Sequence, residues 1–190
     1  MPGVCHFSID PDELHVWALG ALQYFLGSVL VLLTHEILFG SPEENVSEVW
    51  RMICAYYHDH GTPTQYTNFN LKTFLNEKKP LASFPCLRGR DAEAKDLLAP
   101  VADVWRKKSR DHPNHGAVLR MMEAMLEVQR ILHDTANELF VPLDECARIE
   151  TLVDVFLLEY QKLAYAADMD KKWLWSNRVN SAFCGTGAAE

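Results

Sequence analysis

The chain has 190 residues, of which 48% are hydrophobic and 23% are charged, a balance typical of one globular domain with a sizeable core. Its formal net charge of −8 excludes a polycationic nucleic-acid-binding protein. The five cysteines are odd in number and scattered, which favours reduced thiols over a disulfide framework. We therefore expect an intracellular protein, in the cytoplasm or in the nucleus.

The segment from Val16 to Leu33 contains no charged residue and is about as long as a membrane span. Gln23 and Ser28 interrupt it, and its flanks are acidic rather than basic, which disfavours a membrane span. We expect a helix from Asp10 to about Phe39 that is buried at the centre of a helical bundle. A small membrane-anchored protein held by residues 16–33 is the alternative hypothesis.

A second helix is predicted to begin at Ser41, because Ser41 and Glu44 have the spacing of a capping box and Pro42 suits the first helical position. This helix should end near His58–Gly61. Its predicted apolar face consists of Val46, Val49, Trp50, Ile53, Cys54 and Tyr57.

Three further helices follow a loop at residues 77–88, which contains two prolines and should lie packed along the bundle. They are expected at residues 90–110, at residues 115–139, and from an N-cap at Asp144 onward. The inward residues of the last helix are predicted to be Cys146, Ile149, Leu152, Val153, Phe156, Leu157, Tyr160, Leu163, Ala164 and Ala167.

These patterns predict an all-α fold. Residues 1–170 should form a single-domain bundle of about five long helices around the buried apolar N-terminal helix. Residues 171–190 change in character and are expected to form a divergent, partly disordered C-terminal tail.

Cys54, His58 and His60 are the only weak candidates for metal ligands, because Cys54 and His58 are one helical turn apart. No second clustered pair completes such a site, so no metal and no cofactor are expected. A helical metal-binding protein remains a further alternative. The sequence also lacks a phosphate-binding loop, a nucleophile elbow and a dinucleotide fingerprint, and we therefore expect a non-catalytic protein.

Arg106, Lys107, Lys108 and Arg110 form a basic cluster at a predicted helix end and are weak candidates for contacts with nucleic-acid phosphates. The favoured explanation is a solvated helix end whose cations complement the helix dipole. Besides a membrane and nucleic acid, another protein is also a possible partner of the chain.

Short motifs from Tyr24 to Ala167 form a set: Phe25-Leu26-Gly27-Ser28, Ser41-Pro42-Glu43-Glu44-Asn45, Tyr66-Thr67-Asn68-Phe69-Asn70-Leu71, Phe84–Leu97 and Val141-Pro142-Leu143. This set resembles a multicopy family of uncharacterised proteins in dinoflagellate-type protists. More distantly, the helical region is similar to the helical part of CACTA-type transposases. The resemblance implies a soluble helical protein derived from a mobile element, as a divergent or truncated copy, and it implies no catalytic residue.

Overall fold

The computed structural model describes residues 21–79 and 81–176. Within these ranges the chain forms five α-helices and no strand, which confirms the predicted all-α single-domain fold. The helices are α2 (Gln23–Val31), α3 (Pro42–His60), α4 (Asp91–Lys108), α5 (Pro113–Asp134) and α6 (Leu143–Met169). A π-helical turn, η2 (Leu32–Ile37), extends α2, and a 3-10 turn, η3 (Leu71–Thr73), lies between α3 and α4.

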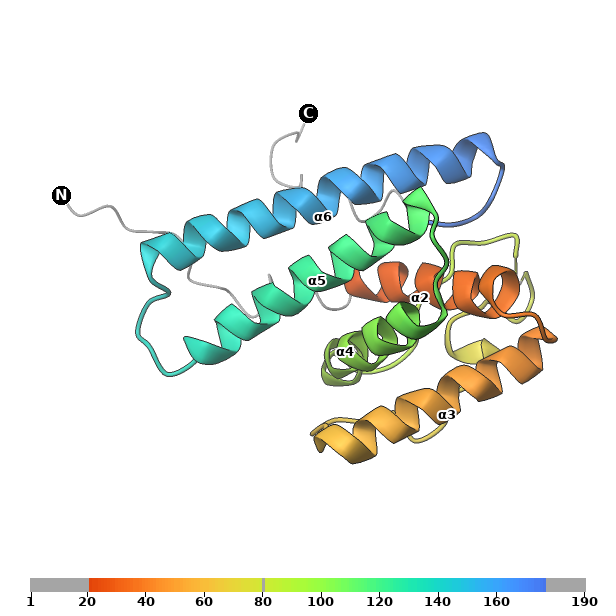
Figure 1. Cartoon of the computed structure of the whole chain (residues 1–190), viewed down its shortest axis with the longest axis horizontal. Coiled ribbons are helices and arrows are strands. Elements are labelled where there is room, and N and C mark those ends of the chain that lie inside the picture. Colours follow the sequence, from red (N-terminus) through yellow and green to blue (C-terminus); the bar gives the residue numbers. More distant parts are fainter. Residues whose placement is uncertain (1–20, 80, 177–190) are drawn as a thin grey trace.

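The two longest helices, α5 and α6, lie antiparallel along one side of the molecule (Figure 1). On the other side of α5, α4 packs against both α5 and α3, and it also contacts α2 and η2. The α2 and η2 segment therefore lies in the interior, where its neighbours come from several other elements.

The apolar segment is buried at every residue from Phe25 to Leu33, whereas Gln23 and Tyr24 are half-buried. Leu22, Leu26, Val29 and Leu33 are each at most 1% exposed. Residues 16–20, where the segment begins, lie outside the described residues. Across the two described ranges, no helix combines the length and the apolar character that a bilayer crossing requires.

The first helical segment ends at Ile37, two residues before the predicted end at Phe39, because the Asn45 side chain binds the backbone there. Asn45 Nδ2 donates to the carbonyl oxygens of Thr34 (2.7 Å) and Gly40 (2.9 Å). The Gly40 N–H donates to Asn45 Oδ1 at 3.0 Å. Asn45 and Thr34 are both buried, so Asn45 supplies the Thr34 carbonyl with a hydrogen bond that it could not obtain from water.

The predicted capping box at the start of α3 is confirmed. Ser41 Oγ accepts the Glu44 N–H, and Glu44 Oε2 accepts the Ser41 N–H at 2.9 Å. Pro42 occupies the first helical position, where it has no hydrogen bond to lose. The helix ends at Gly61, whose φ of 60° lies in the left-handed region that glycine adopts without strain.

Of the loop at residues 77–88, which was predicted to pack along the bundle, only the part from Pro85 to Leu87 does so among the described residues, whereas Leu81 and Phe84 are exposed. Gly27 makes the close approach of this part to α2 feasible. A β-carbon at Gly27 would lie 2.8 Å from the carbonyl carbon of Pro85 and 2.9 Å from the nitrogen of Cys86. The Leu87 N–H donates to the Gln23 carbonyl at 3.0 Å, and the Leu87 side chain is buried in the core.

The predicted boundaries around the α5–α6 connection are wrong by several residues. Helix α5 begins at Pro113 and ends at Asp134, so Leu139 and Phe140 lie in the connection and are exposed. Pro142, rather than Asp144, is the N-cap of α6. Proline has φ fixed near −65° and its carbonyl accepts the Cys146 N–H at 2.9 Å, so the helix starts two residues before the predicted cap.

The segment after α6 belongs to the core, contrary to the predicted tail boundary. The Trp175 side chain is buried, and its backbone N–H donates to Ser28 Oγ in α2 at 3.1 Å. The Tyr160 hydroxyl donates to the Ser176 carbonyl at 3.1 Å. The helical domain therefore includes residues 171–176, and residues 177–190 of the predicted tail lie outside the described residues.

Candidate interaction surface

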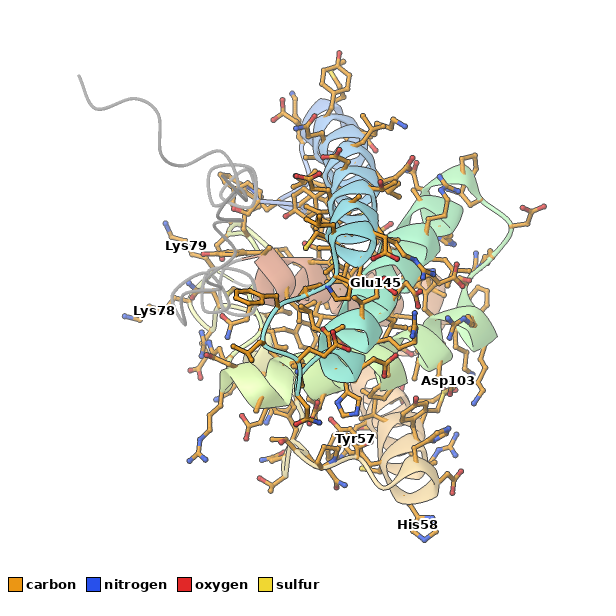
Figure 2. All side chains as sticks on the ribbon, turned by 90° about the vertical axis from the view of Figure 1, so that its left-hand side faces the viewer. Tyr57, His58, Lys78, Lys79, Asp103 and Glu145 are labelled. Carbon is orange, nitrogen blue, oxygen red and sulfur yellow. The ribbon has the colours of Figure 1, made fainter. Side chains whose placement is uncertain are left out.

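The three candidate metal ligands lie on the last two turns of α3. Cys54 is exposed rather than part of the apolar face, and desolvation raises the pKa of its thiol, which opposes the thiolate that a metal requires. The His58 side chain is 89% exposed and points away from the bundle (Figure 2). His60 stacks on Tyr56. Among the described residues, no three His, Cys, Asp or Glu side chains gather where they could hold a metal ion.

Each of the four basic residues near the end of α4 has a partner within the molecule. The contacts are Arg106 to Glu123 (3.3 Å), Lys107 to Asp103 (2.6 Å), Lys108 to Glu48 (2.5 Å) and Arg110 to the Ile37 carbonyl (2.9 Å). The Arg110 guanidinium also lies over the Phe39 ring, 4.6 Å from its centroid. These contacts favour the interpretation of the cluster as a solvated helix end over its interpretation as a binding site for nucleic-acid phosphates.

A cavity of about 460 Å³, large enough for a small ligand, lies beside the α4–α5 turn. Its polar groups largely bind one another. Lys172 Nζ lies 2.8 Å from Glu36 Oε1, and the Arg110 N–H donates to His115 Nδ1 at 3.1 Å. Burial, with a smaller effect of the nearby His112, lowers the pKa of His115 and favours its neutral form. Because these polar groups are already paired with one another, the cavity does not identify a catalytic site.

The inner face of α6 follows the prediction. Phe156, Tyr160, Leu163, Ala164 and Ala167 are buried, and the other five predicted inward residues are half-buried. Their spacing of three and four residues places them along one side of the helix, against α5 and the core. This face explains why α6 forms but leaves its opposite face to be accounted for.

The outward face of α6 carries a second apolar row, which the sequence analysis did not identify. We call Val155, Leu158, Tyr165 and Met169 the α6 outer stripe; their exposed fractions are 38%, 55%, 70% and 67%. With Lys162, they repeat at intervals of three and four residues. The sequence contains this second periodic row, but one amphipathic row already accounted for the helix, so the second row was not recognised as an exposed surface. In Figure 1, α6 forms the upper edge of the molecule, with α5 below it.

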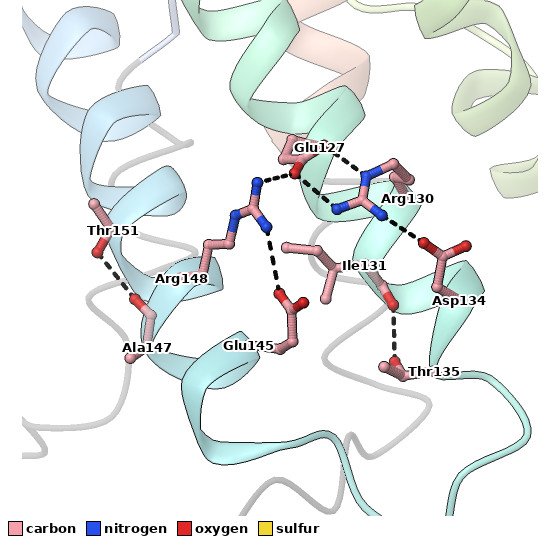
Figure 3. Close-up of polar contacts among 9 residues, drawn as sticks. All are labelled: Glu127, Arg130, Ile131, Asp134, Thr135, Glu145, Ala147, Arg148 and Thr151. Carbon is pink, nitrogen blue, oxygen red and sulfur yellow. Dashed lines mark hydrogen bonds and ion pairs between the residues drawn. The ribbon is translucent and has the colours of Figure 1, made fainter.

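Ion pairs, together with the apolar packing, join α6 to α5. Near its start, Arg148 contacts Glu127, which also accepts two hydrogen bonds from Arg130 at 2.8 Å and 2.9 Å (Figure 3). Near its centre, Arg120 of α5 binds Glu159 at 2.9 Å. The outer stripe is therefore presented on a helix that is anchored both by packing and by charge.

The charge along α6 is asymmetric. Six acidic and two basic residues give the helix a net charge of −4, half of the chain's −8. Glu150, Asp154 and Asp168 fall along one edge of the outer stripe at the helical repeat of 100° per residue. Within residues 21–79 and 81–176, no Lys or Arg forms an ion pair with any of these three carboxylates. The stripe thus combines exposed apolar side chains with an uncompensated negative edge.

The α6 outer stripe has to be understood from its own chemistry, because no protein-family model, curated protein or solved structure matches the chain.

Proposed function

We propose that this chain is a non-catalytic helical protein, derived from the helical region of a mobile element, that acts by binding another protein through the α6 outer stripe. The mobile-element origin is supported by the sequence motifs alone. The binding role is supported by one structural observation, the exposure of Val155, Leu158, Tyr165 and Met169 in a single row.

The position of these residues is what makes the row informative. Single exposed apolar side chains are common on protein surfaces, whereas several aligned along one solvent-facing side of a helix, here on both sides of Lys162, are typical of an interaction site. The inner face of α6 packs against α5 and the core. The outer stripe is exposed on the opposite side of the helix, so it does not take part in this packing.

The anchoring of α6 also suits a binding role. The Arg148–Glu127 and Arg120–Glu159 ion pairs and the buried inner face fix the helix before a partner arrives. A preorganised surface loses little conformational entropy on binding, so more of the apolar contact energy contributes to affinity.

Cross-linking followed by affinity purification from cells of the source organism tests the binding role. The double variant Leu158→Gln/Tyr165→Gln removes the centre of the stripe, and Ala55→Gln/Ala92→Gln introduces two glutamines at exposed helix positions elsewhere. We expect a protein that the wild type and the control retain equally and that the stripe variant loses by about tenfold or more. Identical recovery from all three baits would contradict the proposal.

The proposed origin has an independent test in the genomic DNA around the coding sequence. Terminal inverted repeats, or an adjoining transposase reading frame, are expected on either side of the gene. Flanks without either feature at every genomic copy would remove the support for a mobile-element origin, and they would leave the binding role unaffected.

A further inference from the structure

We infer that the partner of the α6 outer stripe is a basic amphipathic helix, which would pack its apolar row on Val155, Leu158, Tyr165 and Met169 and place Lys or Arg side chains against the acidic edge. This inference rests on the proposed binding function and names the chemistry of the partner.

The spacing of the stripe favours a helix as the partner. Intervals of three and four residues, continued through Lys162, form the narrow seam that two helices share in a coiled coil. From Val155 to Met169 the seam is about 21 Å long at 1.5 Å per residue, which matches about two heptads of a second helix. A strand would present its side chains at a two-residue repeat and would not follow this seam.

The charges beside the stripe favour a basic partner. Glu150, Asp154 and Asp168 lie along one edge, and the described part of the chain provides them with no cationic partner. Glu159, on the other edge, is already bound by Arg120 (2.9 Å) and Lys162 (3.1 Å). The unmet charge is therefore negative and lies on one side, where Lys or Arg flanking an apolar row would complement it.

A second copy of α6 fits this surface poorly. In a parallel pair, the position of Asp154 faces that of Glu159 across the seam, and in an antiparallel pair centred on the stripe it faces that of Asp168. Both arrangements bring like charges together at the edge of an apolar contact. Self-association is thus the outcome that the charge pattern opposes.

Three synthetic 21-residue helical peptides test the inference by isothermal titration calorimetry with the full chain. The first has Leu at the two seam positions of each heptad and Lys beside them. The second replaces each Lys by Glu, and the third keeps Lys but replaces each Leu by Gln. We expect the first peptide to bind at least about tenfold more tightly than either of the others, because it alone combines apolar and charge complementarity.

Variants of the chain locate the binding. Asp154→Asn/Asp168→Asn should weaken binding of the Lys-flanked peptide about tenfold and reduce its salt dependence, whereas Leu158→Gln/Tyr165→Gln should weaken it by about tenfold or more. Ala55→Gln/Ala92→Gln should leave the affinity unchanged. Because all these side chains are solvent-exposed, circular dichroism and the urea midpoint should match the wild type for every variant.

The possible failures are distinguishable. Equal binding of the Lys-flanked and Glu-flanked peptides, lost in the stripe variant, would overturn the basic partner while supporting the proposed binding function. Peptide binding that the stripe variant does not weaken would overturn the inference, and the purification described above would then judge the binding function separately. A dimer seen by sedimentation of the wild type and lost in the stripe variant would assign the stripe to a second copy and also overturn the basic partner.

Discussion

The α2 and α6 helices are both rich in apolar residues, but their surroundings differ. Helix α2 has no charged residue and is buried from Phe25 to Val31, whereas α6 carries eight charged residues and buries only one face. An apolar run without a periodic break is matched by burial on all sides. Two apolar rows separated by charges are matched by one row in the core and another in solvent. Apolar content alone therefore does not tell which role a helix has.

Truncating one leucine in each helix tests whether α2 is part of the core and the outer stripe is not. The α2 truncation has the largest expected effect on the free energy of unfolding. Leu26→Ala in α2 should lower the free energy of unfolding by about 2–5 kcal/mol, because it removes buried contacts and leaves a cavity. Leu158→Ala in the outer stripe should change it by about 0.5 kcal/mol or less. Urea unfolding followed by circular dichroism measures both, and similar losses would show that the outer stripe supports the fold.

Glycine substitution sharpens the description of α2 as a helix with close neighbours on every side. Gly27→Ala would place a β-carbon against the backbone of Pro85 and Cys86, so it should lower the free energy of unfolding by about 1–3 kcal/mol. Gly116→Ala is the matched control in α5, where the nearest atom is Nη1 of the Arg120 side chain at 3.4 Å, an ordinary van der Waals distance. The control should be neutral or stabilising by up to about 1 kcal/mol. A neutral Gly27→Ala would mean that the loop does not lie against α2.

The capping box at the start of α3 stabilises the fold through local hydrogen bonds, so its loss can be compared with the loss of buried contacts in α2. Ser41→Ala should lower the free energy of unfolding by about 0.5–2 kcal/mol, because the Glu44 N–H loses its acceptor. Ser41→Gly should cost only a few tenths of a kcal/mol. Thermal or urea unfolding that ranks alanine at or above the wild type would show that Ser41 does not cap the helix in solution.

The smallest expected effect is the contribution of His115, in the cavity beside the α4–α5 turn, to the pH dependence of the free energy of unfolding. Burial lowers its pKa in the folded chain, so the unfolded chain takes up the proton first as the pH falls below about 6.5. Stability should therefore decrease from about pH 6.5 toward the lowered pKa. His115→Asn can retain an acceptor for the Arg110 N–H and should flatten this slope. Equal slopes for the wild type and the variant in urea unfolding between pH 7.5 and 5.5 would contradict the assignment.

Local sequence signals predicted much of this fold. The capping box at Ser41, the helix end near Gly61 and the inward row of α6 all depend on interactions within a few residues or on helical periodicity. The end at Ile37 did not follow from local signals, because it depends on Asn45 from the next helix. The packing of Trp175 was equally inaccessible, since residues 171–176 have no periodicity and their partner Ser28 is distant in sequence.

The candidate site was predicted less well than the fold. Cys54 was assigned to the apolar face of its helix, but it lies just beyond the buried row that Ile53 and Tyr57 define. The basic residues near Arg110 could be recognised from sequence, but the partners of Arg106, Lys108 and Arg110 come from other elements, whereas Lys107 pairs with Asp103 in its own helix. The outer stripe was visible as a periodic row, and only the tertiary structure shows which row of α6 faces α5.

The hydrogen bond between Trp175 and Ser28 joins residues 147 positions apart, and it sets an order of events during synthesis. Helix α2 leaves the ribosome early, but the side of it that Trp175 covers stays open until the end of the domain has been made. At about 5–20 residues per second, translation of the intervening 147 residues takes roughly 7–30 s. During that time one of the most apolar segments of the nascent chain is incompletely covered.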